Sequence, residues 1–199
     1  LPQAFIAYVY YYEDLLLNMR DQAMAVVDSL GDNATTVQKL LVLHDWLGQQ
    51  AEFDMGSMSD VTEQASADPI QMTVFGTLLT EQLNSEESVY HGAVCLGYAA
   101  AYNYLVQNAF PEIYKNKDGS WKTPEELEEA GNNIVDFGQI MYFCDTAETS
   151  VAGEAFGGGY FNNVHYFNCV RTNESGEDNW YYVDACYDDI YVVCMDQTR

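Results

Sequence analysis

The sequence predicts a single α+β domain in which N-terminal helices pack against a C-terminal antiparallel β-sheet. Segments of the first two thirds of the chain have the patterns of helices, with polar stretches between them, whereas the last third is rich in Tyr, Phe, Val and Ile, which favour strands. Helices followed by strands are typical of this fold class. The 199 residues show no internal repeat and no linker, and the length fits one ordinary domain.

Capping residues and helix breakers delimit the predicted helices. Gly31 ends the first helix, and Pro111 stops a helix that is rich in alanine. Thr123-Pro124-Glu125-Glu126 has the pattern of a capping box, with Thr at the N-cap and Glu at the third helical position. The expected helices span about residues 11–30, 33–50, 75–83, 95–110 and 124–130.

The strands of the C-terminal third are expected at 139–144, 160–170, 180–186 and 190–195. Residues 171–179 contain the Asn, Ser, Gly and Asp of a hairpin loop. If the loop is centred between 174 and 175, His165 and Asp184 face each other on one side of two paired strands. A slip of one residue would undo this arrangement. An imidazole and a carboxylate so placed can make the hydrogen bond that orients the ring.

The charge balance is strongly acidic, with 7 Lys and Arg against 31 Asp and Glu and a formal net charge of −24. Such a field repels nucleic acid and anionic membrane surfaces, and most of these carboxylates are expected on a solvated surface. No apolar run has membrane-spanning length. We therefore expect no nucleic-acid partner and no membrane insertion. Because the chain begins at Leu1, we expect a mature or trimmed chain from which any targeting segment has been removed.

The cysteines are too few for a disulfide scaffold, and their odd number leaves at least one thiol free. No CxxC pair occurs and only three histidines are present, so no zinc site is expected. The sequence does not decide whether the four cysteines other than Cys95 form disulfides or core thiols; these are Cys144, Cys169, Cys186 and Cys194.

Cys95 is expected at the start of the alanine-rich helix. The N-terminus of a helix presents backbone N–H groups and positive potential, which favour a thiolate and can stabilise the oxyanion of a tetrahedral intermediate. Gly92 and Gly97 flank the thiol and permit a close approach of backbone or substrate. With His165 as base and Asp184 as orienting acid, these residues are the parts of a cysteine-nucleophile enzyme for acyl transfer.

Four segments of the chain, taken in order, form a recognisable set. They are Leu43-His44-Asp45-Trp46-Leu47 leading to Glu52-Phe53-Asp54, Gly92-x-x-Cys95-x-Gly97-Tyr98-Ala99, His165-x-x-Asn168, and Trp180-Tyr181-Tyr182-Val183-Asp184 before Tyr187-Asp188-Asp189. Together these segments resemble the bacterial transglutaminase-like superfamily, over about residues 37–190 with a divergent stretch at 55–88.

The resemblance implies a papain-like α+β fold with the catalytic residues Cys95 as nucleophile, His165 as general base and acid, and Asp184 as the acid that orients the histidine. It also implies that residues 33–199 are the catalytic core, with residues 1–32 as a helical extension. Phe167 stands where the family often has Trp, and Cys186 where it has Thr. Related domains usually continue into further strands, so we expect the core to be truncated at its C-terminus.

The resemblance implies acyl transfer from amide bonds. We expect a thioester intermediate, no cofactor and no metal. We expect hydrolysis of a protein or peptide substrate, with transamidation or a catalytically idle surface binding module as alternatives. A structural domain of a larger exported assembly is a further alternative. The acidic surface and the missing initiator methionine favour an extracellular or cell-surface location in a bacterium.

Other features of the chain are better explained by structure than by catalysis. His44 lies on an apolar helical stripe and is expected to be a core histidine bonded to a backbone carbonyl. His91 competes with His165 as base but has no obvious orienting acid. Residues 114–125 match part of a calcium loop but have Tyr114 where Asp is needed. The glycines at 157–159 lack the lysine of a phosphate-binding loop and are expected to form a flap.

Overall fold

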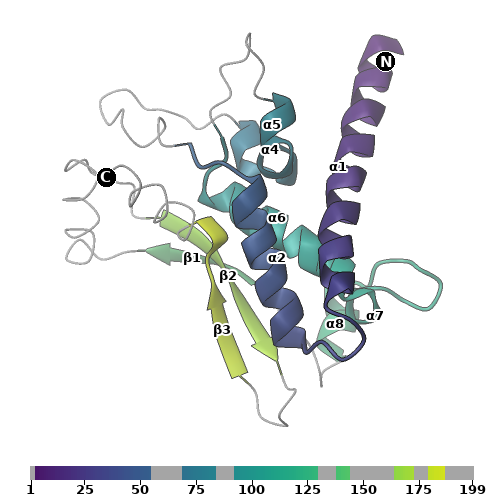
Figure 1. Cartoon of the computed structure of the whole chain (residues 1–199), viewed down its shortest axis with the longest axis vertical. Coiled ribbons are helices and arrows are strands. Elements are labelled where there is room, and N and C mark those ends of the chain that lie inside the picture. The colour runs from purple at the N-terminus through teal and green to yellow at the C-terminus, as the bar shows by residue number, and fades with distance from the viewer. Residues whose placement is uncertain are drawn as a thin grey trace.

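The computed structural model describes residues 3–54, 69–83, 92–129, 138–143, 164–172 and 179–186. Within these residues, a group of helices lies beside a three-stranded antiparallel sheet in the order β1-β2-β3, and helix α6 packs against strand β2 (Figure 1). The helices are α1 (Gln3–Ser29), α2 (Thr36–Gln50), the 3-10 helix η1 (Pro69–Met72), α4 (Val74–Leu78), α5 (Thr80–Leu83), α6 (Cys95–Ala109), α7 (Pro111–Tyr114) and α8 (Pro124–Glu129). The strands are β1 (Gly138–Phe143), β2 (Val164–Thr172) and β3 (Asn179–Val183).

Local signals explain several helix boundaries. The hydroxyl of Thr35 accepts a hydrogen bond from the N–H of Gln38 at 3.1 Å, and the Gln38 side chain accepts one from Thr35 N at 2.9 Å. The predicted capping box before α8 is confirmed by the same reciprocal pair between Thr123 and Glu126, at 2.8 and 3.3 Å. Pro111 follows the end of α6, as predicted, and opens α7. At Thr35 and at Thr123, the reciprocal hydrogen bonds satisfy backbone donors that the start of a helix leaves unpaired.

Other boundaries differ from the prediction. Helix α1 begins well before residue 11, because no Gly or Pro interrupts the chain between Gln3 and Ser29. The predicted helix at 75–83 is replaced by short helical segments that begin at Pro69. Strand β3 ends at Val183 and the chain then turns, so the predicted strand to 186 is wrong. The strand predicted at 190–195 lies outside the described residues.

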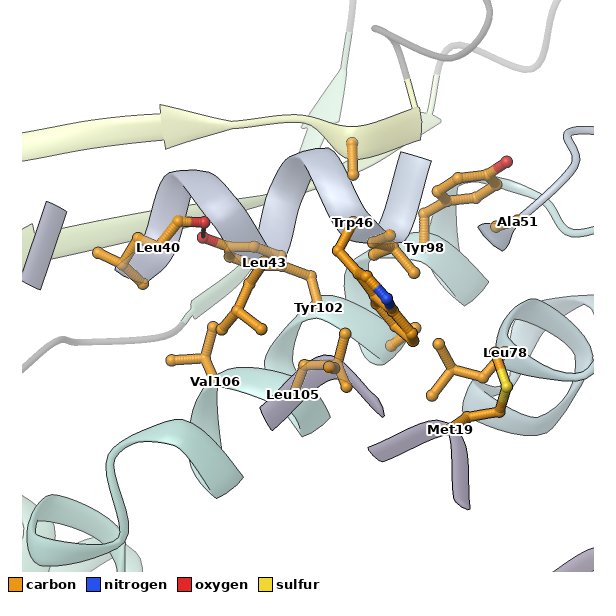
Figure 2. Close-up of a cluster of buried hydrophobic side chains, with 14 of the residues drawn as sticks. Met19, Leu40, Leu43, Trp46, Ala51, Leu78, Tyr98, Tyr102, Leu105 and Val106 are labelled. Atoms are coloured by element: carbon orange, nitrogen blue, oxygen red, sulfur yellow. Dashed lines mark hydrogen bonds between the residues drawn. The ribbon is translucent and has the colours of Figure 1, made fainter. Parts of the chain in front are cut away.

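The core lies where α1, α2 and α6 meet (Figure 2). The phenol of Tyr102, in the middle of α6, is fully buried and donates a hydrogen bond of 3.1 Å to the backbone oxygen of Leu40 in α2. Burial raises the pKa of this phenol, so it stays protonated and can donate. The core side chains from these three helices are Met19, Ala23, Val27, Leu40, Leu43, Trp46, Leu47, Tyr98, Ala101, Tyr102, Leu105 and Val106.

The first turns of α6 fit closely against η1 and α4. A β-carbon added at Gly97 would collide with the backbone oxygen of Gln71 and would lie 2.6 Å from Oγ1 of Thr77. Ala99 and Ala101 are also small and buried. Small side chains therefore let α6 approach its neighbours closely, and its N-terminal end is held in place from outside the helix.

No helix of the described residues is both long enough and apolar enough to cross a membrane.

Two glycine substitutions are expected to change stability in opposite directions. Gly97→Ala should lower the free energy of unfolding by about 1–3 kcal/mol, because the backbone of Gln71 must move to admit the methyl group. A β-carbon added at Gly48, in α2, meets no atom within 4 Å. Gly48→Ala should therefore raise the free energy of unfolding by about 0.4–1 kcal/mol, because alanine makes the unfolded chain less flexible. Urea titrations of both variants measure this difference. Equal effects at both positions would contradict the close packing at Gly97.

Candidate active site

Cys95 is the first residue of α6. The preceding residue, Val94, is extended (φ −111°, ψ 171°) and has no side-chain oxygen to accept from the N–H groups of the first turn. The thiol is not part of a disulfide, is half-buried and packs against the edge of the core. The side chain therefore lies beside the positive end of the helix while keeping access to solvent.

The three residues before Cys95 are held by a second segment of chain, residues 52–54. Ala93 N donates to the oxygen of Glu52 at 2.8 Å, and the N–H of Asp54 donates to the oxygen of Ala93 at 3.0 Å, which forms a parallel bridge. Gly92 has φ of +118°, and a β-carbon there would lie 3.1 Å from Asp54 N. Only glycine fits this backbone without strain, so Gly92 permits the close approach.

A third segment completes this support. The backbone oxygen of Gln71 accepts from the N–H of Val94 at 3.1 Å. The Gln71 side chain donates from Nε2 to Oδ2 of Asp54 at 2.7 Å, and both residues are buried, with 5% and 4% of their surface exposed. The ring of Phe53 lies 6.3 Å from that of Tyr98 in the first turns of α6. Residues 52–54, 71 and 92–94 thus form one hydrogen-bonded unit around the start of the helix.

His165 and Asp184 lie at the same end of the sheet, because β2 begins at Val164 and the antiparallel β3 ends at Val183. His165 is described by its backbone, which pairs with Tyr142 of β1. Asp184 follows β3 directly and is buried, with 6% of its surface exposed.

The predicted hairpin register is wrong by two residues. Asn168 pairs with Val183 and Thr172 pairs with Asn179. Continued by one position beyond β3, this register would place Asp184 opposite Phe167 and not opposite His165. The reason is the loop, whose centre is one residue further along the chain than its composition suggested. Asp184 lies just past the end of β3, so the strand ladder does not set which face of the sheet its side chain takes.

Strand β2 is joined to the helix of Cys95 by a buried side chain. Nδ2 of Asn168 donates to the backbone oxygen of Ala99 at 3.1 Å, and Asn168 is 2% exposed. Ala99 lies about one helical turn after Cys95, and Asn168 lies three residues after His165. The hydrogen bond therefore anchors the strand that contains His165 to the helix that begins at Cys95. Ala185 and Cys186, which follow Asp184, are buried in the core.

The other sequence-based candidates have separate positions. His44 is half-buried in α2, with Nδ1 3.1 Å from Oδ1 of Asp45. Asp118 accepts hydrogen bonds from the N–H and hydroxyl of Ser120, at 3.0 and 2.6 Å, and these bonds lower its pKa. Among the described residues, no group of three or more His, Cys, Asp or Glu side chains is arranged to hold a metal ion. His91 and the glycines at 157–159 lie outside those residues.

Sequence reasoning missed Gln71 as a member of the site. Gln71 falls in the stretch where the resemblance to the superfamily is lost, and no local pattern distinguishes it from other polar residues there. Asp54 contributed to the resemblance but had no assigned role. Only the folded chain brings the two side chains together.

Comparisons with protein-family models, with curated proteins and with solved structures found no match to this chain. The assignment of roles therefore rests on the residues themselves and on their positions.

The Asn168 anchor yields a pH-dependent prediction. In Asn168→Asp, a carboxylate would face the oxygen of Ala99 without a proton to donate, so the variant should lose about 1–3 kcal/mol of stability at pH 7. Burial raises the pKa of this introduced carboxyl group in the folded state, and only the protonated form donates. The loss relative to wild type should therefore shrink as pH falls toward 5, because folding then favours the protonated form.

Urea titrations of Asn168→Asp and wild type at several pH values between 5 and 7.5 measure this difference. Asn168→Ala serves as the control, because it loses the hydrogen bond but gains no titrating group. A deficit in Asn168→Asp that does not change with pH would argue against a buried donor role for Asn168.

Proposed function

We propose that this protein is a cysteine-nucleophile enzyme that cleaves amide bonds in a protein or peptide substrate through a thioester intermediate. In this proposal Cys95 is the nucleophile, His165 is the general base and acid, and Asp184 orients the histidine. The fold is then a papain-like variant of the transglutaminase-like superfamily. The observation that carries the proposal is the position of Cys95 as the first residue of α6, after a residue that cannot cap the helix with its side chain.

Two properties of this position support nucleophilic chemistry. The unpaired N–H groups and the positive end of the helix dipole favour the thiolate, which is the reactive form of cysteine. The same N–H groups can stabilise the negative oxygen that develops when the thiolate attacks a carbonyl carbon. Since Val94 has no side-chain acceptor, it does not compete for these donors.

The proposed reaction has two stages. His165 takes the proton of the Cys95 thiol, and the sulfur forms a bond to the carbonyl carbon of the amide. When the carbon–nitrogen bond breaks, the protonated histidine gives its proton to the leaving amine, and a thioester remains on Cys95. Water then attacks the thioester with His165 as base, which releases the acid and regenerates the thiol.

The arrangement of the sheet supports the roles of the histidine and the aspartate. His165 lies near the start of β2 and Asp184 directly follows the end of the adjacent antiparallel β3, so both lie at the same end of the sheet. Asp184 is buried, and a buried carboxylate requires hydrogen-bonding partners. In the proposed enzyme the imidazole of His165 is one of these partners. The anchor between Asn168 and Ala99 holds this end of the sheet against α6.

The proposal predicts selective reactivity of Cys95. With limiting iodoacetamide at pH 6, peptide mass spectrometry should find Cys95 labelled first, and His165→Ala should slow this labelling. The labelling rate of Cys95 in the chain unfolded by urea provides the reference for an ordinary thiol. Buried Cys186 should label far more slowly than Cys95 in the native chain. If native and unfolded chains labelled at equal rates at Cys95, the proposed activation would be wrong.

The chemistry itself can be tested with a library of peptides. Cys95→Ala should abolish hydrolysis, and His165→Ala should lower kcat/KM by about 10²–10⁴-fold, the usual contribution of a positioned acid–base group. A parallel assay supplies a labelled primary amine. Incorporation of the amine in excess of hydrolysis would replace the proposed hydrolase with a transamidase. Activity that persists in Cys95→Ala would reject the nucleophile.

A further inference from the structure

We propose that Asp54 and Gln71 are positioning residues for Cys95, and that their buried hydrogen bond fixes the backbone N–H groups at the N-terminus of α6. The inference rests on the proposed function, since it describes how the nucleophile is held. Neither residue is expected to touch the substrate. Both act through the backbone of residues 92–94.

The hydrogen bonds form a closed circuit. Asp54 is bonded through its backbone N–H to the oxygen of Ala93 at 3.0 Å, and Gln71 is bonded through its backbone oxygen to the N–H of Val94 at 3.1 Å. The side chains of Asp54 and Gln71 close the circuit at 2.7 Å. Since Ala93 and Val94 are adjacent in the chain, neither can shift without breaking a bond on one side. Cys95 follows directly, so its backbone is held from both sides.

The side-chain bond is suited to a rigid role. A hydrogen bond to a carboxylate is stronger than one between neutral groups, and burial removes the water that would compete for it. Both residues are almost fully buried. Breaking the bond leaves a buried polar group without that partner, which is costly, so alternative arrangements of the two segments are disfavoured. Gly97, packed against the oxygen of Gln71, adds a steric limit to the same movement.

This role differs from a general contribution to stability. If the circuit only holds the fold together, its loss lowers the free energy of unfolding and leaves the thiol of the folded molecules unchanged. If the circuit positions the N–H groups, its loss also changes how well they favour the thiolate. The rate of alkylation of Cys95 as a function of pH reports on the folded molecules and requires no substrate.

An exchange of the two functional groups provides the test. Gln71→Glu alone places two carboxyl groups against each other, and Gln71→Met removes the donor at similar size. Either variant should slow alkylation of Cys95 by about tenfold at pH 6, or move the midpoint of its pH profile upward, because a charge-assisted bond is lost. The double variant Asp54→Asn/Gln71→Glu restores a donor and a carboxylate with unchanged net charge. It should recover most of the rate.

Tyr102→Phe is the matched control, because it removes another buried hydrogen bond of α6, farther along the helix. It should lower stability and leave the alkylation profile of Cys95 unchanged. Circular dichroism restricts the comparison to folded variants, and Gln71→Met replaces Gln71→Glu if the latter is unfolded. If the wild-type thiol is activated and the folded Gln71 variants have the same pH profile of Cys95 alkylation as wild type, the positioning role is wrong but the proposed function is not. An unactivated wild-type thiol would overturn the proposed function as well.

Discussion

The position of helix α6 is the constraint on which the rest of this structure depends. Among the described residues, α6 packs against β2, α1, α2, α4 and η1, so that it is enclosed by elements from both halves of the chain. Its buried residues include the small Gly97, Ala99 and Ala101 beside the large Tyr98 and Tyr102. The small residues allow the neighbouring backbone to come close. A helix enclosed in this way cannot tilt or slide by itself, so the residue at its start has a fixed environment.

Features governed by neighbouring residues were predictable from the sequence. The end of α6 before Pro111 and the capping box of Thr123 both follow from signals within a few positions. A helix cap and a proline act on backbone groups close by, so their effect does not depend on the rest of the fold. The same holds for the existence of β2 and β3, although not for their pairing.

Features that depend on long-range contacts were not predictable in the same way. The register of β2 and β3 was displaced by two residues, because composition alone does not locate the centre of a loop. Gln71 was not recognised, because its role requires Asp54 and Val94, which come from other segments. The roles of Cys95, His165 and Asp184 remain predictions that rest on motif and position. Sequence order alone shows neither which groups meet nor how closely.

The parallel bridge between Phe53 and Ala93 has a consequence for the biosynthesis of the proposed enzyme. The bridge joins segments about forty residues apart, and the bond from Gln71 to Val94 spans more than twenty. Contacts of this kind form only after the chain has closed large loops, which delays them relative to helix formation. A chain that is still folding therefore has an ordinary thiol at Cys95. In the proposed enzyme, the raised reactivity of Cys95 would then appear only after these long-range contacts have formed.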